Sequence, residues 1–295
     1  MNGISRRAFL RIAGLGALAG AFRPKFAFAI NPSEFEIKGL INPHGLCAVD
    51  ENSIAVAEAG SYSIKIFKIA PVELILSIGR AGSREGELNY PKGVSLDSNG
   101  NFVVCDTNNG RVCVFDRNGR FLKQFGSLGG AAGNLFSPHA ARVYKNKLYV
   151  INTRGHWVTV FDYVTTEAVA VFGELGDDSD KPAQQGYKFR MPLDLWVDDE
   201  GIFVVDSKHS RIVILDHDGN LKKIVKLSAS QPTNIVRTPE LSAITDFSGK
   251  KIIFVDHAFS NFHEKELGFR PWGIAALKDN IWVSDLEGGR VIKID

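Results

Sequence analysis

The chain has 295 residues, of which 44% are hydrophobic and 23% charged, and its formal net charge is +2. This composition belongs to a globular protein with a large core and excludes a disordered, collagen-like or disulfide-scaffold chain. Residues 1–29 hold five of the 35 Lys and Arg but no Asp or Glu, so the remainder has 30 basic and 33 acidic residues. Because this remainder is weakly acidic, nucleic acid is not an expected partner.

Residues 1–29 are typical of an export signal. The basic segment 5–11 (Ser-Arg-Arg-Ala-Phe-Leu-Arg) precedes an apolar run over residues 12–22, and Ala-Phe-Ala at 27–29 places small residues at the positions that determine cleavage. The apolar run is too short for the roughly 20 residues that span a bilayer, so no stable membrane insertion is expected. The pattern resembles twin-arginine signals. An ordinary secretory signal is the alternative, and either one predicts a periplasmic protein made of residues 30–295.

Three cysteines follow, at positions 47, 105 and 113. Their number is odd and no pair has C-x-x-C spacing, so the pattern supports neither a zinc ribbon nor a redox motif. A chain that folds in a reducing cytosol before export does not depend on disulfides. We expect Cys47, Cys105 and Cys113 to be structural thiols buried in the core.

A recurring phrase organises residues 30–295. Gly-Glu-Leu-Asn-Tyr-Pro at 86–91 returns as Gly-Asn-Leu-Phe-Ser-Pro at 133–138 and more loosely at 186–192. After Pro91, β-rich runs at 102–106, 111–116 and 121–126 are separated by polar turns such as Asn-Gly. Alternating or β-branched runs joined by such turns predict antiparallel hairpins.

Six prolines mark the repeats. Their spacings of 48, 47, 54, 40 and 39 residues are close to the length of a four-stranded propeller blade. In four repeats an acidic residue is followed five positions later by a basic one, as in Asp106 and Arg111, which predicts an ionic tie between neighbouring strands. The prolines are Pro43, Pro91, Pro138, Pro192, Pro232 and Pro271.

The two ends of the array complete each other. The last repeat stops after its third strand, at residues 291–294, whereas an extra β-rich segment at 35–38 precedes the first repeat. Pairing these segments would close a ring and cover an exposed sheet edge. No linker divides the array, so we predict one domain over residues 30–295, present as a monomer.

Residues 91–126 resemble the NHL repeat. The matching phrase reads Pro-x-Gly-Val-x-x-Asp, then Val-x-Asp-x-x-Asn-x-Arg-Val-x-Val-Phe-Asp, then Phe-Gly, and its recurrences extend over about residues 34–295. The resemblance implies an all-β fold, a six-bladed β-propeller of the NHL type. It implies no single function, because propellers include enzymes, scaffolds and sensors.

The resemblance also implies which residues surround the channel. In this architecture the segment after each proline starts the innermost strand, so the residue that follows the proline lies at the channel mouth. These residues are His44, Lys92, His139, Leu193, Thr233 and Trp272. From them, from the next position along each strand and from the turn of the third repeat, we predict ligand-binding residues Lys92, Arg154, Asp194, Asn234 and Trp272.

The Pro-His turns at His44 and His139 resemble the zinc-binding turns of peptidyl-α-hydroxyglycine amidating lyases. Those propellers have three such turns, whereas the third position here is Thr233, and residues 106–110 lack the lyase tyrosine. Three interpretations follow: both histidines are structural, they contact a substrate directly, or they hold one divalent metal, Zn²⁺ or Ca²⁺, completed by Asp194 or another group. The acidic segment 177–180 could also hold Ca²⁺, although a solvated loop is the favoured interpretation.

The sequence therefore predicts an exported propeller that binds a protein, peptide or small ligand at the channel mouth and the surrounding loops. One alternative is a metal-dependent lyase or hydrolase that uses His44 and His139 as metal ligands. A scaffold in a periplasmic complex, with an empty channel, is the other. No catalytic residue is assigned.

Overall fold

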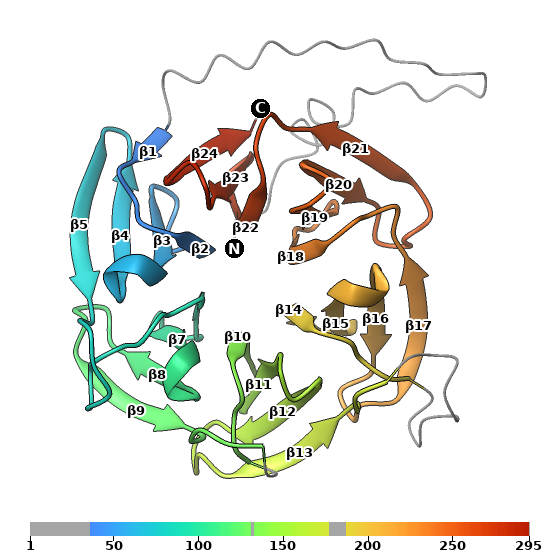
Figure 1. The fold of residues 1–295 in the computed structure, drawn as a ribbon, viewed down its shortest axis with the longest axis horizontal. Helices are drawn as coiled ribbons and strands as arrows, with labels where there is room; N and C mark the ends of the chain where they lie inside the picture. The colour runs from blue at the N-terminus through green and yellow to red at the C-terminus, as the bar shows by residue number, and fades with distance from the viewer. Residues whose placement is uncertain (1–35, 131–132, 177–186, 295) are drawn as a thin grey trace.

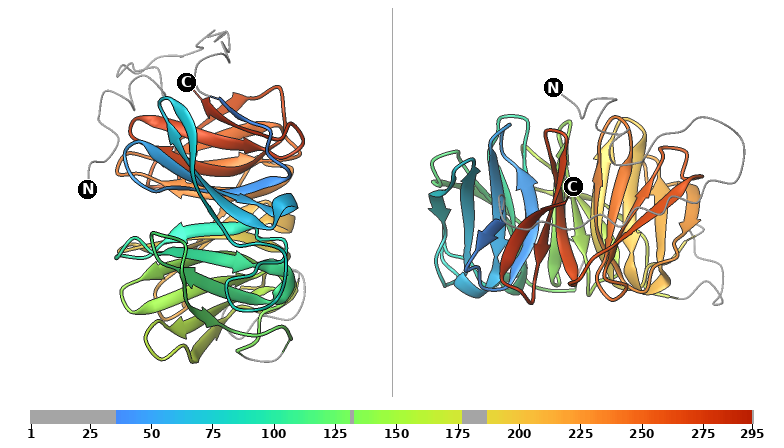
Figure 2. Two further views of the ribbon diagram at one scale, coloured as in Figure 1. Left: turned by 90° about the vertical axis from the view of Figure 1, so that its left-hand side faces the viewer. Right: turned by 90° about the horizontal axis from the view of Figure 1, so that it is seen from above.

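In the computed structural model, residues 36–130, 133–176 and 187–294 are described, and they form six four-stranded antiparallel sheets around a central channel (Figure 1). The predicted all-β six-bladed propeller is therefore confirmed. The predicted signal at residues 1–29 and the acidic segment 177–180 lie outside the described residues. From the side, the ring is a disc whose innermost strands run roughly along the channel axis, whereas the outer strands follow the rim (Figure 1 and Figure 2).

The blades follow one another along the chain, each from the channel outward. Blade I contains β2 (Pro43–Ala48), β3 (Ser53–Glu58), β4 (Ser63–Ile69) and β5 (Val72–Ile78). Blade II contains β6 (Gly93–Leu96), β7 (Phe102–Asp106), β8 (Arg111–Phe115) and β9 (Phe121–Phe125). Blade III contains β10 (Pro138–Tyr144), β11 (Lys147–Asn152), β12 (Trp157–Asp162) and β13 (Ala168–Phe172).

The second half repeats this arrangement. Blade IV contains β14 (Pro192–Asp198), β15 (Gly201–Asp206), β16 (Arg211–Leu215) and β17 (Leu221–Lys226). Blade V contains β18 (Pro232–Arg237), β19 (Ser242–Asp246), β20 (Lys251–Val255) and β21 (Phe262–Glu266). Blade VI contains β22 (Pro271–Leu277), β23 (Asn280–Asp285), β24 (Arg290–Ile294) and β1 (Glu36–Lys38). Short 3₁₀ turns join the second and third strands of three blades: η1 (Ala59–Ser61), η2 (Thr107–Asn109) and η3 (Ser207–His209).

Blade VI closes the ring as predicted. β1 pairs antiparallel with β24, with Glu36 opposite Ile292 and Lys38 opposite Arg290. The Arg290 guanidinium also donates a 3.0 Å hydrogen bond to the Glu36 carboxylate. The sheet thus joins the two ends of the described chain, and only Phe35 of the predicted closing segment lies outside the described residues.

The hydrophobic core lies between neighbouring blades. One cluster, for example, combines Ala55 and Ile64 of blade I with Val94 and Phe102 of blade II. All five residues of β7 are buried, whereas alternate residues of the outer strand β9 face solvent. A strand that is covered on both faces is mostly apolar, whereas an outer strand alternates between buried and exposed residues. The pattern of burial therefore agrees with the pattern of apolar residues in the sequence.

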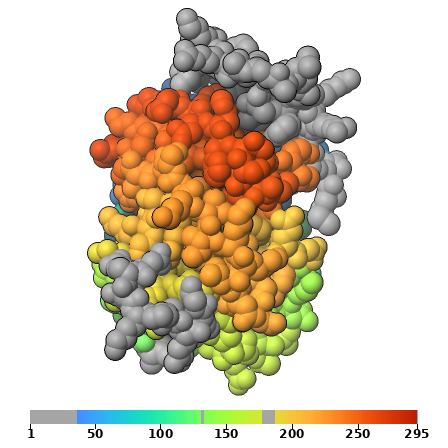
Figure 3. Space-filling model, turned by 90° about the vertical axis from the view of Figure 1, so that its right-hand side faces the viewer, coloured from blue at the N-terminus to red at the C-terminus, as the bar shows by residue number. Residues whose placement is uncertain are grey.

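The rim of blades IV and V is protected by charge. In the space-filling view, blades IV and V cover one side of the molecule (Figure 3). Their outer strands β17 and β21 carry exposed charged residues such as Lys222 and Glu264. Charged side chains on edge strands discourage pairing with other chains.

All three cysteines are free thiols. Cys105 and Cys113 are buried, whereas Cys47 is only half-buried. Burial raises the pKa of the Cys47 thiol to about 11 and that of Cys113 to about 12. Because the thiolate is the reactive form, these thiols are inert at neutral pH.

Glycines bring the innermost strands together at the start of the channel. The Gly45 amide donates a 2.9 Å hydrogen bond to the Lys92 carbonyl. A Cβ atom at Gly93 would lie 2.3 Å from the His139 carbonyl oxygen, and one at Gly273 would lie 2.2 Å from that of His44. The Pro-x-Gly phrase therefore permits a close backbone approach that a larger residue would prevent.

Hydroxyl groups tie neighbouring blades together at four of the six junctions of the ring. Each hydroxyl comes from the end of a second strand, or the turn after it, and donates to a carbonyl at the start of the following innermost strand. The pairs are Thr107 to Pro138 at 2.8 Å, Thr153 to Pro192 at 2.8 Å, Thr245 to Trp272 at 2.7 Å and Ser284 to His44 at 2.7 Å. These bonds fix the backbone from which the residues at the channel mouth project.

The predicted ionic ties occur in three of the four blades. Their distances are 2.8 Å for Asp106 and Arg111, 2.7 Å for Asp206 and Arg211, and 2.8 Å for Asp285 and Arg290. In blade V the lysine expected to pair with Asp246 instead forms a 2.7 Å ion pair with Glu264 on the neighbouring outer strand. These charges are structural and unavailable to a ligand.

Candidate ligand-binding site at the channel mouth

The channel end at which the innermost strands begin, here called the mouth, contains a pocket of about 230 Å³. Five blades contribute to its lining. The basic and imidazole side chains are Lys92, His139, Arg154 and Lys208, and the apolar ones are Met191, Leu193 and Trp272. Neutral polar residues complete the wall: Ser137, Thr153, Ser207 and Gln231.

Lys92 and His139 form the centre of this pocket. The Lys92 ammonium lies 3.1 Å from Nε2 of His139, and it also lies 5.6 Å from the centroid of the Tyr90 ring. Burial lowers the pKa of Lys92 to about 8, assisted by the Arg154 charge. Burial, together with the charges of Lys92 and Arg154, holds the pKa of His139 well below its usual value. A neutral imidazole therefore accepts a hydrogen bond from the lysine.

His44 stands behind the pocket wall. Its Nδ1 donates a 2.9 Å hydrogen bond to the Asn42 carbonyl, which places the neutral ring's lone pair on Nε2. The ring packs edge-to-face on Trp272 and Tyr90, at centroid distances of 5.1 and 5.7 Å. Burial lowers the pKa of His44 to about 4, assisted by the Lys92 charge. His44 thus supports Trp272 and does not itself line the pocket.

Arg154 and Lys208 occupy equivalent places on neighbouring blades. Each is exposed and follows a Thr or Ser in the turn after the second strand: Asn152-Thr153-Arg154 in blade III and Asp206-Ser207-Lys208 in blade IV. The Arg154 guanidinium lies 5.4 Å from the centroid of the Phe136 ring. Its backbone amide is fixed by a 3.1 Å bond to the Phe136 carbonyl. Both cations therefore lie at the rim of the pocket, held by well-anchored turns.

The charge of the mouth is uncompensated among the described residues. Lys92, Arg154 and Lys208 line the pocket, and no described Asp or Glu does. None of the three takes part in an ion pair with the described acidic residues. Three like charges around a partly enclosed space create a positive potential, which an anion would relieve.

Asp194 and Asn234 lie elsewhere. The buried Asp194 carboxylate accepts hydrogen bonds from the amides of Leu195 (2.8 Å) and Ile235 (2.9 Å) and from the Asn234 side chain (3.0 Å). Arg142 is its nearest cation, at 3.7 Å. Burial raises the pKa of Asp194, and these donors and the arginine oppose that shift. The pair thus bridges β14 and β18 at the position that glycine occupies in blades I, II and VI.

The predicted metal ligands have other partners in this structure. Nε2 of His139 lies 3.1 Å from the Lys92 ammonium, whereas Nδ1 of His44 donates to a carbonyl, an arrangement that leaves Nε2 able to ligate a metal. Asp194, the proposed third ligand, accepts hydrogen bonds from three other donors. Across the residues that the structure describes, no group of three or more His, Cys, Asp or Glu side chains could hold a metal ion. A metal at His44 and His139 therefore stays a prediction.

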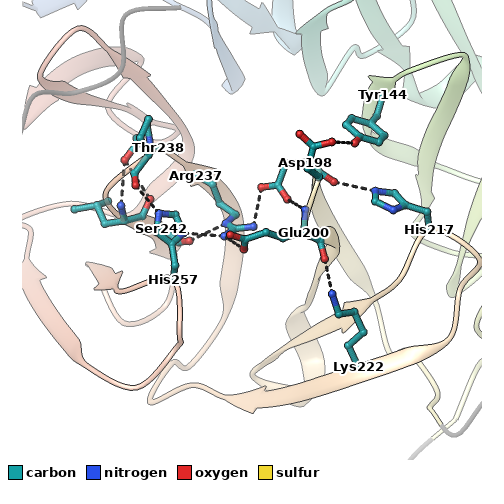
Figure 4. Close-up of polar contacts among 12 residues, drawn as sticks. Tyr144, Asp198, Glu200, His217, Lys222, Arg237, Thr238, Ser242 and His257 are labelled. Atoms are coloured by element: carbon teal, nitrogen blue, oxygen red, sulfur yellow. Dashed lines mark hydrogen bonds and ion pairs between the residues drawn. The ribbon is translucent and has the colours of Figure 1, made fainter.

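The opposite face of the disc contains a second cluster of charges, shown in Figure 4. Buried Arg237 donates to Asp198 (2.7 Å), to Glu200 (2.6 Å) and to Nδ1 of His257 (2.8 Å), and its guanidinium lies 3.7 Å from the centroid of the Phe203 ring. This cation is fully compensated and joins blades IV and V. Acidic partners are thus present around the buried cation on the opposite face, and their lack is a feature of the mouth.

The other end of the channel has a larger pocket of about 280 Å³, lined mostly by apolar residues. Arg142 is the one charged residue that lines it within the described chain, and Asp194 balances that charge from 3.7 Å. Trp196 lies against the Arg142 guanidinium at 5.8 Å. The two channel ends therefore differ in charge, and only the mouth is strongly cationic.

Comparison with known proteins agrees with this architecture. The NHL repeat model matches residues 88–115, which include the connection before blade II and its first three strands. The chain carries an NHL repeat. Within residues 36–130, 133–176 and 187–294, no helix has the length and apolar character required to cross a bilayer.

Several curated proteins share part of this NHL-repeat propeller. RING finger protein nhl-1 of Caenorhabditis elegans is 49% identical over 73 residues, 25% of this chain. Protein brain tumor of Drosophila melanogaster is 31% identical over 144 residues, 48% of this chain. B-box type zinc finger protein ncl-1 of C. elegans is 35% identical over 154 residues, 52% of this chain. The matched regions span only 7%, 13% and 17% of these relatives.

Solved structures share the fold at low sequence identity. Virginiamycin B lyase of Staphylococcus aureus superposes with a TM-score of 0.61 at 12% identity, covering 85% of this chain and 80% of that one. A chain of the nidogen/laminin complex superposes with a TM-score of 0.65 at 17% identity, covering 80% of this chain and 85% of that one. At these identities the likeness shows the propeller fold and nothing about the ligand.

Proposed function

We propose that this protein is a binding module that takes its ligand at the channel mouth. The observation that supports the proposal is the convergence of five blades on one pocket, where Lys92, His139, Arg154 and Trp272 meet. Four of the residues predicted from the repeat pattern thus share one concave site, and concave sites with a few convergent polar groups are where ligands bind. A protein, a peptide or a small molecule could each supply the bound group.

A compound library tests the proposal without assuming a ligand class. Neutral, cationic and anionic compounds would be screened by thermal shift against the wild type, Trp272→Ala and Trp196→Ala. Trp196 provides a matched control because it lines the other channel end. We expect compounds that stabilise the wild type and Trp196→Ala but not Trp272→Ala, because bound ligand stabilises the folded state. An absence of stabilising compounds, or sensitivity only to Trp196→Ala, would exclude the mouth as the ligand site.

The same preparation tests the metal-dependent alternative. Protein purified without chelators would be analysed for Zn²⁺ and Ca²⁺, with His44→Ala as the comparison. About one ion per chain, lost in the variant, would favour the lyase or hydrolase. We expect substoichiometric metal that the substitution leaves unchanged, because His139 already pairs with Lys92.

Export to the periplasm by the twin-arginine route is a further part of the proposal, supported by the residues at 5–11 and 27–29. In a bacterial host, Arg6→Lys combined with Arg7→Lys is expected to abolish the processed periplasmic protein and leave full-length chain in the cytoplasm. Arg11→Lys, a charge-conserving change in the same segment, is the control and should be exported normally. Unchanged export of the double variant would point to the ordinary secretory alternative.

A further inference from the structure

We infer that the ligand at the mouth is an organic acid, with a carboxylate held by the cations and a short apolar group held by the opposite wall. The inference rests on the proposed function, because it names the chemical class of ligand for the same site. A free small acid and the last residue of a peptide share this chemistry. The two sources are distinguished in the experiment below.

The pocket at the mouth has a positive charge that no described acidic residue balances. The half-buried Lys92 and the exposed Arg154 and Lys208 come from three different blades and converge on one pocket. No acidic residue of the described chain lines that pocket, whereas Arg237 on the opposite face has two carboxylates within 2.7 Å. The structural cation Arg237 is therefore neutralised by its partners, whereas the cations of the mouth are not. A bound anion would supply the missing charge.

The hydrogen-bond donors of Lys92 and Arg154 suit a carboxylate in number and in shape. One donor of Lys92 is directed at Nε2 of His139, 3.1 Å away, which leaves the other ammonium hydrogens for a ligand. Arg154 presents a planar guanidinium whose paired N–H groups match the two oxygens of a carboxylate. Hydrogen bonds from both residues to one carboxylate would also hold the ligand in one orientation.

The pocket also has an apolar wall. Met191, Leu193 and Trp272 line the same pocket as the cations, and Trp272 is supported from behind by His44 at 5.1 Å and by Phe247 at 5.3 Å. A fully hydrated inorganic ion gains nothing from such a wall, whereas an alkyl group is stabilised by leaving water. The volume of about 230 Å³ limits this group to a short chain or a single side chain.

Calorimetric titration of the full-length mature protein with isocaproate tests the inference, and isocaproamide, which has the same shape without the charge, is the matched probe. We expect isocaproate to bind at least about tenfold more tightly than the amide, because the amide loses the charge-assisted bonds. Raising the salt concentration should weaken isocaproate binding and leave the amide unchanged. Inorganic phosphate should bind more weakly than isocaproate, because it cannot use the apolar wall.

Variants assign the effect to the three cations. Lys92→Met, Arg154→Ala and Lys208→Ala should each weaken isocaproate binding, and the Arg154→Ala and Lys208→Ala double variant should weaken it at least about tenfold. Lys68→Ala removes an exposed lysine of β4 that does not line the pocket, so it should bind as the wild type does. A short peptide ending in leucine, compared with its amidated form, distinguishes the source: tighter binding by the peptide acid than by isocaproate indicates a chain end, and weaker binding indicates a small acid.

Three results would overturn the inference. These are equal affinity for isocaproate and its amide, stronger binding of phosphate, or isocaproate affinity that is unaffected in the double variant. A neutral compound whose binding depends on Trp272 would contradict the carboxylate but still support a ligand site at the mouth. The two proposals can therefore fail separately.

Discussion

Asp194→Ala is expected to lower the free energy of unfolding by about 3–5 kcal/mol, because it removes a buried carboxylate and leaves its partners without an acceptor. The amides of Leu195 and Ile235 would lose their hydrogen bonds, and Arg142 would lose its nearest counter-ion. Urea denaturation at neutral pH measures the change. Asp194→Asn retains one acceptor oxygen and should therefore lose less stability than the alanine variant.

The control for this experiment is Asp199→Ala, since the Asp199 side chain is 92% exposed and ought to change stability by no more than about 0.5 kcal/mol. If Asp194 were a ligand-binding residue at the mouth, its substitution would weaken isocaproate binding and have little effect on unfolding. The structural assignment predicts the opposite: a large loss of stability and, in Asp194→Asn, an affinity within about twofold of the wild type.

The protein is expected to lose about 2 kcal/mol of stability between about pH 7.5 and pH 5 through His44 alone. Its pKa in the folded protein is about 4, against an ordinary value of 6.5 for an exposed histidine. Between these values the unfolded chain binds a proton that the folded chain does not, so stability falls as the pH is lowered. The buried imidazole of His139 has a lowered pKa and contributes in the same direction.

Urea denaturation at the two pH values, with a chelator present, measures this change in the free energy of unfolding with pH, here called the pH slope. His44→Gln removes the titrating group, so its stability should change less with pH than that of the wild type. His263→Gln, which replaces an exposed histidine of β21, should keep the wild-type slope. An unchanged slope in His44→Gln would mean that the ring is accessible to protons in the folded state, contrary to its burial behind Trp272.

Much of the fold could be predicted from the sequence because each repeat contains residues that the local backbone conformation requires. The Pro-x-Gly phrase appears where the innermost strands touch, and the missing fourth strand of the last repeat indicated that β1 would pair with β24. These features depend on strand length and turn chemistry, which become visible when the repeats along the chain are compared with one another.

The site was harder to predict because side-chain direction within the ring depends on neighbouring blades. His44 and His139 follow equivalent prolines, yet His139 lines the pocket whereas His44 bonds to Asn42 and packs behind Trp272. Asp194 faces Asn234, which replaces glycine on the next blade, so the two side chains bond to each other. A pattern along one strand contains no information about such contacts between strands.

Lys208 was missed, although the repeat contained a signal for it. It occupies the same position in the blade IV turn as Arg154 does in blade III, and both line the pocket. Aligning the turns of neighbouring blades would have identified this second cation, since equivalent positions in a propeller point toward the same channel end. The net charge of residues 30–295, with 30 basic and 33 acidic residues, gave no indication of a cationic site.

The most direct test of the cationic mouth as the ligand site is a crystal structure of the protein with isocaproate bound. The account predicts density for the acid between Lys92, Arg154 and Lys208, with its carboxylate within hydrogen-bond distance of at least two of them and its alkyl group against Trp272. Density at the opposite channel end beside Arg142, or an empty mouth at saturating isocaproate, would contradict it.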